Sequence, residues 1–377
     1  MDFTLSETQR MLAETTDRLM RERYGFEERK KILAGPDGFS RALWATFAEL
    51  GVTGLGIDEE YGGLNGTMGD LAVVAEAFGR ALVVEPYMPT IVLGAGTLSL
   101  AGSDAQRTEL LPQVAAGDLF LALAHGEPKS RYTLCHVDTR AEPDGADHLL
   151  TGAKAVVLGG DAADQFLVSA RTAGTATDPH GISLFLVPKN APGLTIRAYP
   201  NIDGTRAADL RLDRVRVPAS ARIGEPGQAL PIVAHAVDRA IAYLCAEAVG
   251  AMQALNALTL DYLKTRTQFG VPIGSFQVLQ HRMVDMEVAL EQARSMAILA
   301  ADRADDPHPH ERSRAVSAAK VQIGRSGRLI GQSAVQMHGG IGITEEYAGG
   351  HYFKRLTLID RTFGDADHHL ARFAAAN

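Results

Sequence analysis

The apolar residues between positions 279 and 297 recur at the spacing of one face of an α-helix. Intervals of four, three, four, three and four residues separate Leu279, Met283, Met286, Leu290, Ala293 and Ala297. A stripe of this kind is typical of a helix that packs in a bundle, so we interpret these side chains as core rather than as a cofactor site. The sequence therefore predicts a long bundle helix in this region.

The helical pattern extends on both sides of this stripe. It begins after Pro226-Gly227, and the polar run from Asp305 to His310 interrupts it before a further helix from about Glu311 to His338. The two histidines of that run, His308 and His310, are each next to a proline. A solvated loop explains them better than metal ligation. The region 226–377 is therefore expected to be a C-terminal helical bundle.

The middle of the chain has a different pattern. Its apolar runs are short, rich in Leu and Val, and bounded by Gly, Pro or Asp; they cover residues 148–152, 165–170, 182–187 and 210–217. The last run alternates apolar and polar residues, as a strand with one solvated face does. We predict a small β domain of antiparallel character over residues 119–225.

The N-terminal residues 1–118 are expected to form a third, helical domain. Ser6 and Gln9 have the spacing of a capping box that begins a helix. Further helical segments alternate with glycine-rich turns, of which Tyr61-Gly62-Gly63 is the clearest. The predicted fold class is therefore mixed α and β, in the order helical, β, helical.

Composition excludes several classes of protein. A chain of 377 residues is too long for one compact core, and its 46% hydrophobic and 22% charged residues are typical of soluble globular proteins. The formal charge of −8 argues against nucleic acid as the main partner. Cys135 and Cys245 lie in different segments, so a disulfide framework is not expected. The sequence shows no signal peptide and no membrane span, and we expect a cytoplasmic protein.

Two motifs suit a ligand that combines a pyrophosphate with an aromatic ring system. The first runs from Arg266 to Gln277 and supplies a cation, an aromatic ring and an amide. The second runs from Gln336 to Gly342, where an amide precedes glycines that allow close backbone approach. Taken alone, the first could be a helix C-cap with a packed Phe269, and the second only a turn. The chain has neither a dinucleotide fingerprint nor a Walker loop, so a nucleotide would not bind on a Rossmann unit.

With these motifs the chain resembles the acyl-CoA dehydrogenases over nearly its whole length. The resemblance also covers residues 1–6, 49–52, 61–63 and 126–128. It implies an N-terminal helical domain, a middle antiparallel β domain and a C-terminal four-helix bundle, with FAD between the last two. It also implies α,β-desaturation of an acyl-CoA thioester, in which a proton leaves Cα and a hydride passes from Cβ to flavin N5.

The resemblance is strongest to the small subunit of pimeloyl-CoA dehydrogenase and to actinobacterial steroid side-chain dehydrogenases. Such enzymes often consist of two related chains in an α2β2 tetramer. The expected partners are an acyl-CoA substrate, an electron-transfer flavoprotein or similar acceptor, and either identical or related subunits. A flavin monooxygenase or nitroalkane oxidase on the same scaffold is a further alternative.

The resemblance implies three groups of FAD contacts. Arg266, Phe269 and Gln277 match contacts to the adenine diphosphate half, and the neighbouring subunit's contacts match Gln336, Gly339 and Gly340. Backbone near Leu123, His125 and Gly126 remains a candidate for the isoalloxazine ring. Where an indole commonly shields the flavin, this chain has Val156. Its only Trp, Trp44, lies in the N-terminal helices.

The family's catalytic carboxylate is missing at both of its known positions. Phe363 occupies the usual place near the C-terminus, and Ala240 occupies the second place on the first bundle helix. Asp238 is the nearest acid and is our candidate base, although two residues along a helix correspond to about 200° of rotation. Asp365 and Asp367 are weaker candidates that would more simply cap a helix. The alternative is a base-deficient, non-catalytic subunit whose partner carries a complete site.

Overall fold

The computed structural model describes residues 4–376, so the first three residues of the resemblance at positions 1–6 lie outside the described part. The chain divides into two compact units. The first comprises the chain up to Ile32, Met68–Val83, and the chain from Ile241 onward; the second comprises Leu33–Thr67 and Val84–Ala240.

Amphipathic helices form the N-terminal part of the first unit. They are α1 (Glu7–Arg23), the beginning of α2 (Phe26–Ala34) and α4 (Met68–Ala81). The predicted capping box at the start of α1 is confirmed. The Ser6 hydroxyl accepts from the Gln9 N–H at 3.1 Å, and the Gln9 side chain accepts from the Ser6 N–H at 3.1 Å.

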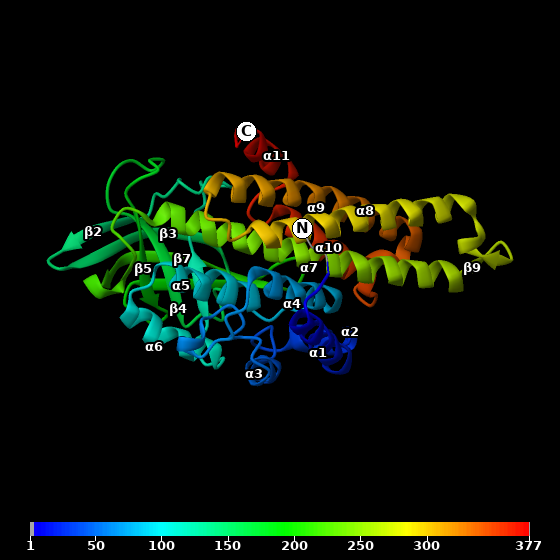
Figure 1. Cartoon of the computed structure of the whole chain (residues 1–377), viewed down its shortest axis with the longest axis horizontal. Helices are drawn as coiled ribbons and strands as arrows, with labels where there is room; N and C mark the ends of the chain where they lie inside the picture. The colour runs from blue at the N-terminus through cyan, green and yellow to red at the C-terminus, as the bar shows by residue number, and fades with distance from the viewer. Residues whose placement is uncertain (1–3, 377) are drawn as a thin grey trace. The chain divides into compact units, whose positions relative to one another are not determined.

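Long antiparallel helices form the predicted C-terminal bundle (Figure 1). They are α7 (Ala229–Thr265), α8 (Gln277–Arg303), α9 (Pro309–His338), α10 (Ala348–Arg361) and the shorter α11 (Ala366–Ala375). The apolar stripe of α8 is confirmed as core from Met286 onward, since Met286, Leu290, Ala293 and Ala297 are buried. Leu279 and Met283, nearer the start of the helix, are only half-buried. Asn256 of α7 donates to Glu287 of α8 at 3.2 Å. Arg355 of α10 pairs with the buried Glu247 of α7 at 2.6 Å.

Helix α7 is long and apolar enough to cross a membrane, with a mean hydropathy of 1.3 in its most apolar window. The sequence analysis did not anticipate this. However, 67% of that window is buried inside the protein, which is how a core helix of a packed bundle behaves.

Short helices lead into the sheet of the second unit. They are α3 (Arg41–Glu49), a 3₁₀ turn at Glu59–Tyr61, a π-helix at Met88–Ala95, α5 (Gly96–Ala101) and α6 (Asp104–Ala115). The indole of Trp44 donates to the Gly117 carbonyl at 3.0 Å and packs on Phe120 with ring centroids 4.8 Å apart. Trp44 therefore belongs to the core of this unit.

An eight-stranded sheet makes up the rest of the second unit, in the order β6-β7-β3-β2-β4-β5-β8, with β1 paired to β4. The strands are β1 (Leu121–Ala124), β2 (Arg140–Asp144), β3 (Asp147–Leu158), β4 (Gln165–Arg171), β5 (Ile182–Pro188), β6 (Leu194–Pro200), β7 (Arg206–Val217) and β8 (Arg222–Ile223). The predicted antiparallel character holds for most pairs. However, β1 and β2 lie parallel to β4, because each reaches it through a crossover rather than a hairpin.

The pairing of β3 with β7 contains two irregularities. The register shifts between Leu150 and Gly152 and again between Lys154 and Val157. Two residues close to these shifts have left-handed backbone, Val156 on β3 (φ +53) and Arg214 on β7 (φ +52). Bulges of this kind bend a strand and re-aim the side chain of the extra residue.

Candidate functional site

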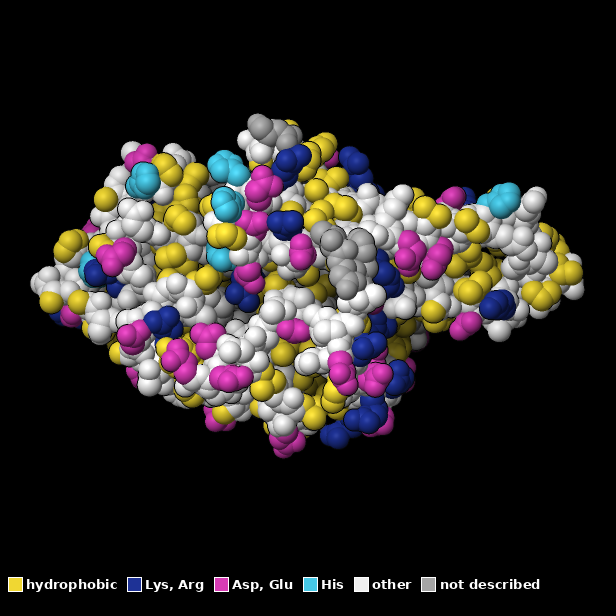
Figure 2. All heavy atoms as spheres, in the orientation of Figure 1, with side chains coloured by type: hydrophobic (Ala, Val, Ile, Leu, Met, Phe, Trp, Pro, Cys, Tyr) yellow, Lys and Arg dark blue, Asp and Glu magenta, His cyan; other side chains and the backbone are white. Residues whose placement is uncertain are grey.

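The first predicted motif lies at one end of the helical bundle. Helix α7 ends at Thr265, and a short hairpin of β9 (Thr267–Gln268) and β10 (Val271–Pro272) follows before a 3₁₀ turn, Ile273–Ser275. Phe269 and Gly270 form the hairpin turn with φ of +55 and +83, the left-handed pair that a tight hairpin requires. Apolar atoms gather on the surface at this end, to which Phe269, Val271 and Phe276 contribute (Figure 2).

The exposure of Phe269 separates the two interpretations of this motif. Its side chain is 93% exposed, so it is not the packed phenylalanine of a simple helix C-cap. Arg266 and Gln277 are also exposed, and within the described residues 4–376 the Arg266 guanidinium forms no ion pair. A cation, an aromatic ring and an amide are therefore presented together, available to a ligand or a partner chain.

The second motif lies at the same end of the bundle. The His338 ring, at the end of α9, packs on the Tyr262 ring of α7 with centroids 4.6 Å apart. Its Nδ1–H donates to the Ala334 carbonyl at 2.8 Å, and its Nε2 accepts from the Tyr347 hydroxyl at 2.9 Å. These contacts fix both ends of the intervening turn, Gly339–Ile343.

The glycines of that turn have different reasons to be glycine. Gly339 has a φ of +65, a backbone conformation that disfavours other residues. Gly340 does not, and a Cβ atom added there would meet nothing within 4 Å. Nothing inside the chain therefore demands glycine at position 340. The turn is open at this position, and the FAD contact expected there stays a prediction.

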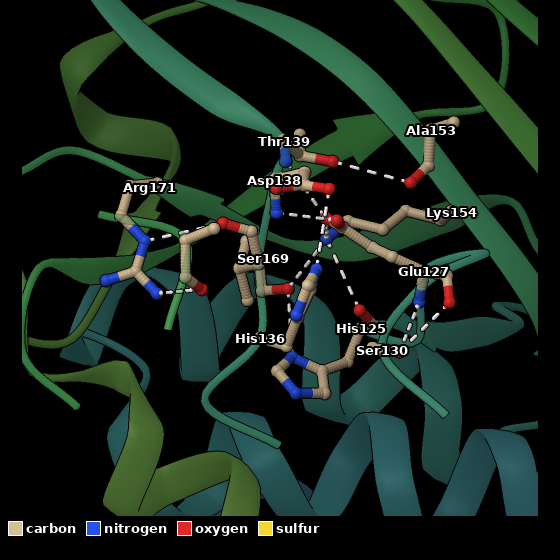
Figure 3. Close-up of polar contacts among 12 residues, drawn as sticks. His125, Glu127, Ser130, His136, Asp138, Thr139, Ala153, Lys154, Ser169 and Arg171 are labelled. Atoms are coloured by element: carbon tan, nitrogen blue, oxygen red, sulfur yellow. Dashed lines mark hydrogen bonds and ion pairs between the residues drawn. The ribbon is translucent and has the colours of Figure 1, made fainter. Parts of the chain in front are cut away.

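The candidate ring contacts Leu123, His125 and Gly126 lie in the second unit, at the end of β1. Leu123 and His125 are buried, whereas Gly126 is exposed. The His125 ring points into the domain, where Nε2–H donates to the Leu134 carbonyl at 2.9 Å and Nδ1 accepts from Ser169 at 2.9 Å (Figure 3). The His125 side chain is thus committed to contacts inside the domain, and the backbone role predicted for these three residues stays a prediction.

A buried ion pair lies directly behind these residues. The Lys154 ammonium donates to the Glu127 carboxylate at 2.7 Å, to the Ser169 hydroxyl at 3.0 Å and to the His125 carbonyl at 3.3 Å (Figure 3). Glu127 also accepts from the backbone N–H groups of Asp138 (2.6 Å) and Thr139 (3.0 Å). All three Lys154 protons are used, so β1, β3, β4 and the loop after Glu127 are joined at one point.

The pKa values of this cluster are shifted. Burial lowers the pKa of Lys154 to about 8 against the opposing pull of Glu127. Burial, and next the charge of Lys154, lowers the pKa of His125 to about 4. Burial alone would raise the pKa of Glu127, but the charge and hydrogen bond of Lys154 outweigh it and the pKa is lowered. The pair is therefore charged at neutral pH and the imidazole is neutral.

Sequence reasoning did not identify this cluster, although a signal was present. Lys154 lies an even number of residues from the inward-facing Leu150 in the same strand, which places both on one face. A lysine at an inward position of an apolar strand requires a buried partner, and Glu127 is that partner.

The candidate catalytic bases lie on α7 and at the start of α11. Asp238 is 1% exposed and Ala240 is fully buried, both on α7, which is one uninterrupted helix from Ala229. The two side chains therefore point in directions about 200° apart. Asp365 accepts from the His368 N–H at 3.0 Å as the N-cap of α11, as its simpler interpretation predicted, and Asp367 is exposed.

The segment around Phe363 is strained and held from behind. Phe363 has a φ of +59 and Gly364 a φ of +120. The buried Lys320 donates to the carbonyls of Asp360 (2.9 Å) and Gly364 (2.6 Å), and His369 donates to the carbonyl of Phe363 at 3.1 Å. Burial lowers the pKa of Lys320 to about 8 and that of His369 to about 2, the latter helped by the charge of Lys320.

Metal ligation finds no support in the part of the chain that the structure describes. No group of three or more His, Cys, Asp or Glu side chains there could hold a metal ion. His308 and His310 are exposed, but α9 begins at Pro309, so His308 is its N-cap residue and His310 lies in its first turn rather than in the predicted loop.

Family models match three consecutive parts of the chain. The N-terminal domain of acyl-CoA dehydrogenases matches residues 6–118, the middle domain matches residues 122–215, and the C-terminal domain matches residues 230–376. Among curated proteins, the acyl-CoA dehydrogenase IpdE2 of Mycobacterium tuberculosis is 32% identical, over 94% of this chain and 92% of that protein.

Solved structures of similar chains extend this comparison. A variant of the Tcur3481-Tcur3483 steroid ACAD is 29% identical with a TM-score of 0.88, over 99% of this chain and 98% of that one. The ChsE4-ChsE5 complex of Mycobacterium tuberculosis contains a chain 25% identical with a TM-score of 0.87, over 100% of this chain and 98% of that one. The FAD complex of PigA is 25% identical with a TM-score of 0.91, over 100% of this chain and 98% of that one. The chain therefore belongs to the acyl-CoA dehydrogenase family, whose members are typically FAD-dependent oxidoreductases acting on the CH–CH bond of acyl-CoA thioesters.

Proposed function

We propose that this chain binds FAD and desaturates an acyl-CoA thioester between Cα and Cβ. The observation that carries the proposal is the exposure of Arg266, Phe269 and Gly340 at one end of the bundle. Among residues 4–376 the Arg266 guanidinium forms no ion pair, and the Phe269 ring meets only the edge of Phe276, with centroids 6.3 Å apart. A guanidinium provides paired donors to a phosphate, and an open glycine lets backbone N–H groups approach it.

The residues proposed to hold FAD come from two neighbouring subunits. Arg266, Phe269 and Gln277 of one subunit would contact the adenine diphosphate half. Gln336, Gly339 and Gly340 would do so from a neighbouring subunit. The backbone of Leu123, His125 and Gly126, together with Val156, would face the ring. Cofactor binding and subunit association should then strengthen each other.

Bound FAD supplies the hydride acceptor for this chemistry. The protein has to remove a proton from Cα of the thioester and stabilise the charge that develops on its carbonyl oxygen. We propose Asp238 as the base, because it is a buried acid within two residues of Ala240. Since two residues correspond to about 200° of rotation, the start of α7 would have to become irregular to bring the Asp238 carboxylate to Cα.

The second candidate function is a base-deficient subunit of a heteromeric dehydrogenase. The observation that favours it is Phe363, an aromatic residue held in a strained segment where the resemblance expects a carboxylate. The regular geometry of α7 around Asp238 also favours a base-deficient subunit. In this case a related partner chain, in an α2β2 assembly, would carry the base.

We further propose a medium, dicarboxylic or ring-bearing acyl-CoA as substrate and an electron-transfer flavoprotein or similar protein as electron acceptor. A cytoplasmic location fits the two unpaired cysteines. The division into 1–118, 119–225 and 226–377 remains our proposed domain organisation.

Anaerobic reduction of the bound flavin separates the two candidate functions. The purified chain, loaded with FAD, is mixed without oxygen with acyl-CoA thioesters of several lengths and with a ring-bearing one. Bleaching of the visible flavin band by the chain alone supports the dehydrogenase. Bleaching only after a related partner chain is added supports the base-deficient subunit. A chain that binds no FAD in either state contradicts both.

A further inference from the structure

Val156 has a backbone conformation that a β-branched residue adopts only under constraint. Its φ is +53, and it lies in the register shift between Lys154 and Val157 in the pairing of β3 with β7. Strain of this kind persists only where neighbouring contacts over-determine the backbone, and it clusters at ligand sites. The Val156 side chain is 58% exposed, so it contributes little to the core that would compensate for the strain.

Asp209 of β7 holds this bulge from one side. Its Oδ1 accepts from the Val156 N–H at 3.1 Å and from the Tyr199 hydroxyl at 2.9 Å, while its Oδ2 accepts from Arg197 at 2.6 Å. Burial alone would raise the pKa of Asp209, but the hydrogen bonds from Arg197, Val156 and Tyr199 lower it. The carboxylate is therefore ionised and oriented by two side chains from β6 before it reaches Val156.

The buried ion pair holds the bulge from the other side. The Ala155 N–H donates to the Gly126 carbonyl at 2.8 Å, and the Lys154 ammonium reaches the His125 carbonyl and Glu127. Lys154 is thus fixed by its own buried side chain, Ala155 by its backbone hydrogen bond to Gly126, and Val156 by the Asp209 carboxylate. This arrangement joins the bulge directly to the residues proposed to face the flavin ring.

We propose that Asp209 is a positioning residue for the flavin, which keeps Val156 in its left-handed conformation so that the apolar Val156 side chain and the Gly126 backbone present one fixed surface to the ring. The inference rests on the proposed FAD binding and goes beyond it. It assigns a role to a carboxylate that need not touch the ligand, and it assigns a function to the strain at Val156.

The sheet itself provides a control for the strain. Arg214 is exposed, has a φ of +52 and lies at the other irregularity of the same strand pair. Val156→Gly and Arg214→Gly therefore remove the same kind of backbone strain at two bulges. Both variants are expected to match or exceed the wild-type melting temperature without FAD, because glycine accepts a positive φ at no steric cost. Only Val156→Gly is expected to change the visible spectrum of bound FAD and to weaken its binding.

Asp209→Ala tests the positioning role with the Val156 side chain in place. The dissociation constant of FAD, followed by flavin fluorescence, should rise roughly fivefold, which corresponds to the loss of one hydrogen bond. The flavin absorption band should also shift. Asp209→Asn retains an acceptor for the Val156 N–H and should restore most of both properties. Asp147→Ala is the control: it removes a different carboxylate of the sheet, paired with Arg216 of β7, and should leave FAD binding unchanged.

The outcomes distinguish this inference from the proposed function. If the wild-type protein binds FAD but Asp209→Ala and Val156→Gly bind it with wild-type affinity and spectrum, the positioning role is refuted while FAD binding stands. Equal spectral changes in Arg214→Gly and Val156→Gly would also refute it, because the effect would then be a general loosening of the sheet. If Asp209→Ala does not fold, the comparison of Val156→Gly with Arg214→Gly decides the question. A wild-type protein that binds no FAD removes both proposals together.

Discussion

Lys154 and Glu127 form an ion pair at 2.7 Å in which both side chains are almost completely shielded from water. Lys154→Met removes the cation and leaves the carboxylate buried without its charge partner. We expect a loss of about 3 to 5 kcal/mol in the free energy of unfolding, measured by urea denaturation. The double variant with Glu127→Gln should recover part of it. Lys189→Met, which breaks the exposed pair with Asp164, should cost less than about 1 kcal/mol; an equal loss in both single variants would contradict this explanation.

Acidification should destabilise the protein through buried neutral histidines. The pKa values of His125 and His369 lie at about 4 and about 2, below the ordinary value of 6.5, so the unfolded chain binds more protons than the folded one as the pH falls from 6.5 toward 4. The free energy of unfolding should therefore decrease over that range, by about 1.4 kcal/mol per pH unit for each histidine. His369→Gln should reduce the slope by about one such increment. The exposed His310→Gln should leave it unchanged, and a slope unaffected by His369→Gln would show that this histidine is not held neutral.

Arg266→Ala should reduce the FAD content of the purified protein and shift it toward smaller oligomers. The guanidinium provides charge-assisted donors to phosphate at the end of the bundle, and such contacts are stronger than neutral hydrogen bonds. Flavin absorbance per chain and size-exclusion chromatography measure the two effects. Lys264→Ala, in the preceding turn of α7, removes an equally exposed cation and serves as the control. Full flavin content in Arg266→Ala would exclude the assignment.

Gly340→Val should lower the affinity for FAD without destabilising the chain. A Cβ at this position meets nothing within 4 Å inside the chain, so only an external molecule would encounter the added side chain. Gly25→Val is the matched control, because position 25 has the same open surroundings and also lacks a positive φ. Isothermal titration with FAD and thermal unfolding give the two readings. Equal FAD affinity in both variants and the wild type would mean that the turn is only structural.

Asp238→Asn should leave FAD bound and abolish flavin reduction by acyl-CoA if Asp238 is the base. The amide keeps the size of the side chain but cannot accept the Cα proton, so stopped-flow bleaching should fall by at least about a hundredfold. Asp302→Asn, at an exposed position of α8, is the control. Wild-type bleaching in Asp238→Asn would remove this residue from the mechanism and favour a base on a partner chain.

Much of the fold could be predicted from the sequence, because its signals are local. The α8 stripe, the Ser6 capping box and the Leu- and Val-rich strands each depend on a short-range pattern within one element. Each is confirmed, except that Leu279 and Met283 of the stripe are only half-buried. The parallel pairing of β1 with β4 depends on a crossover that no local pattern records. The membrane-like hydropathy of α7 results from burial on many sides, which a reading for amphipathic stripes does not capture.

The candidate site was predictable where a residue type itself is informative. An arginine three residues before an aromatic residue and a pair of glycines could be recognised as motifs, and the structure places both at one end of the bundle. The polar network behind Gly126 could not be recognised, because Lys154, Glu127 and Ser169 come from distant segments that meet only after the sheet forms. The strain at Val156 could not be predicted from the sequence either, since it arises from a register shift between two strands.

The backbone around Phe363 is held by Lys320 and His369 through carbonyl groups alone. Since none of these bonds involves the side chain at position 363, they can be kept by any residue that tolerates the left-handed φ of +59 there. A substitution at position 363 changes the side chain that is presented there, while the surrounding helices keep their positions. Gain or loss of chemistry at this position can thus occur by a single substitution, with no rebuilding of the bundle.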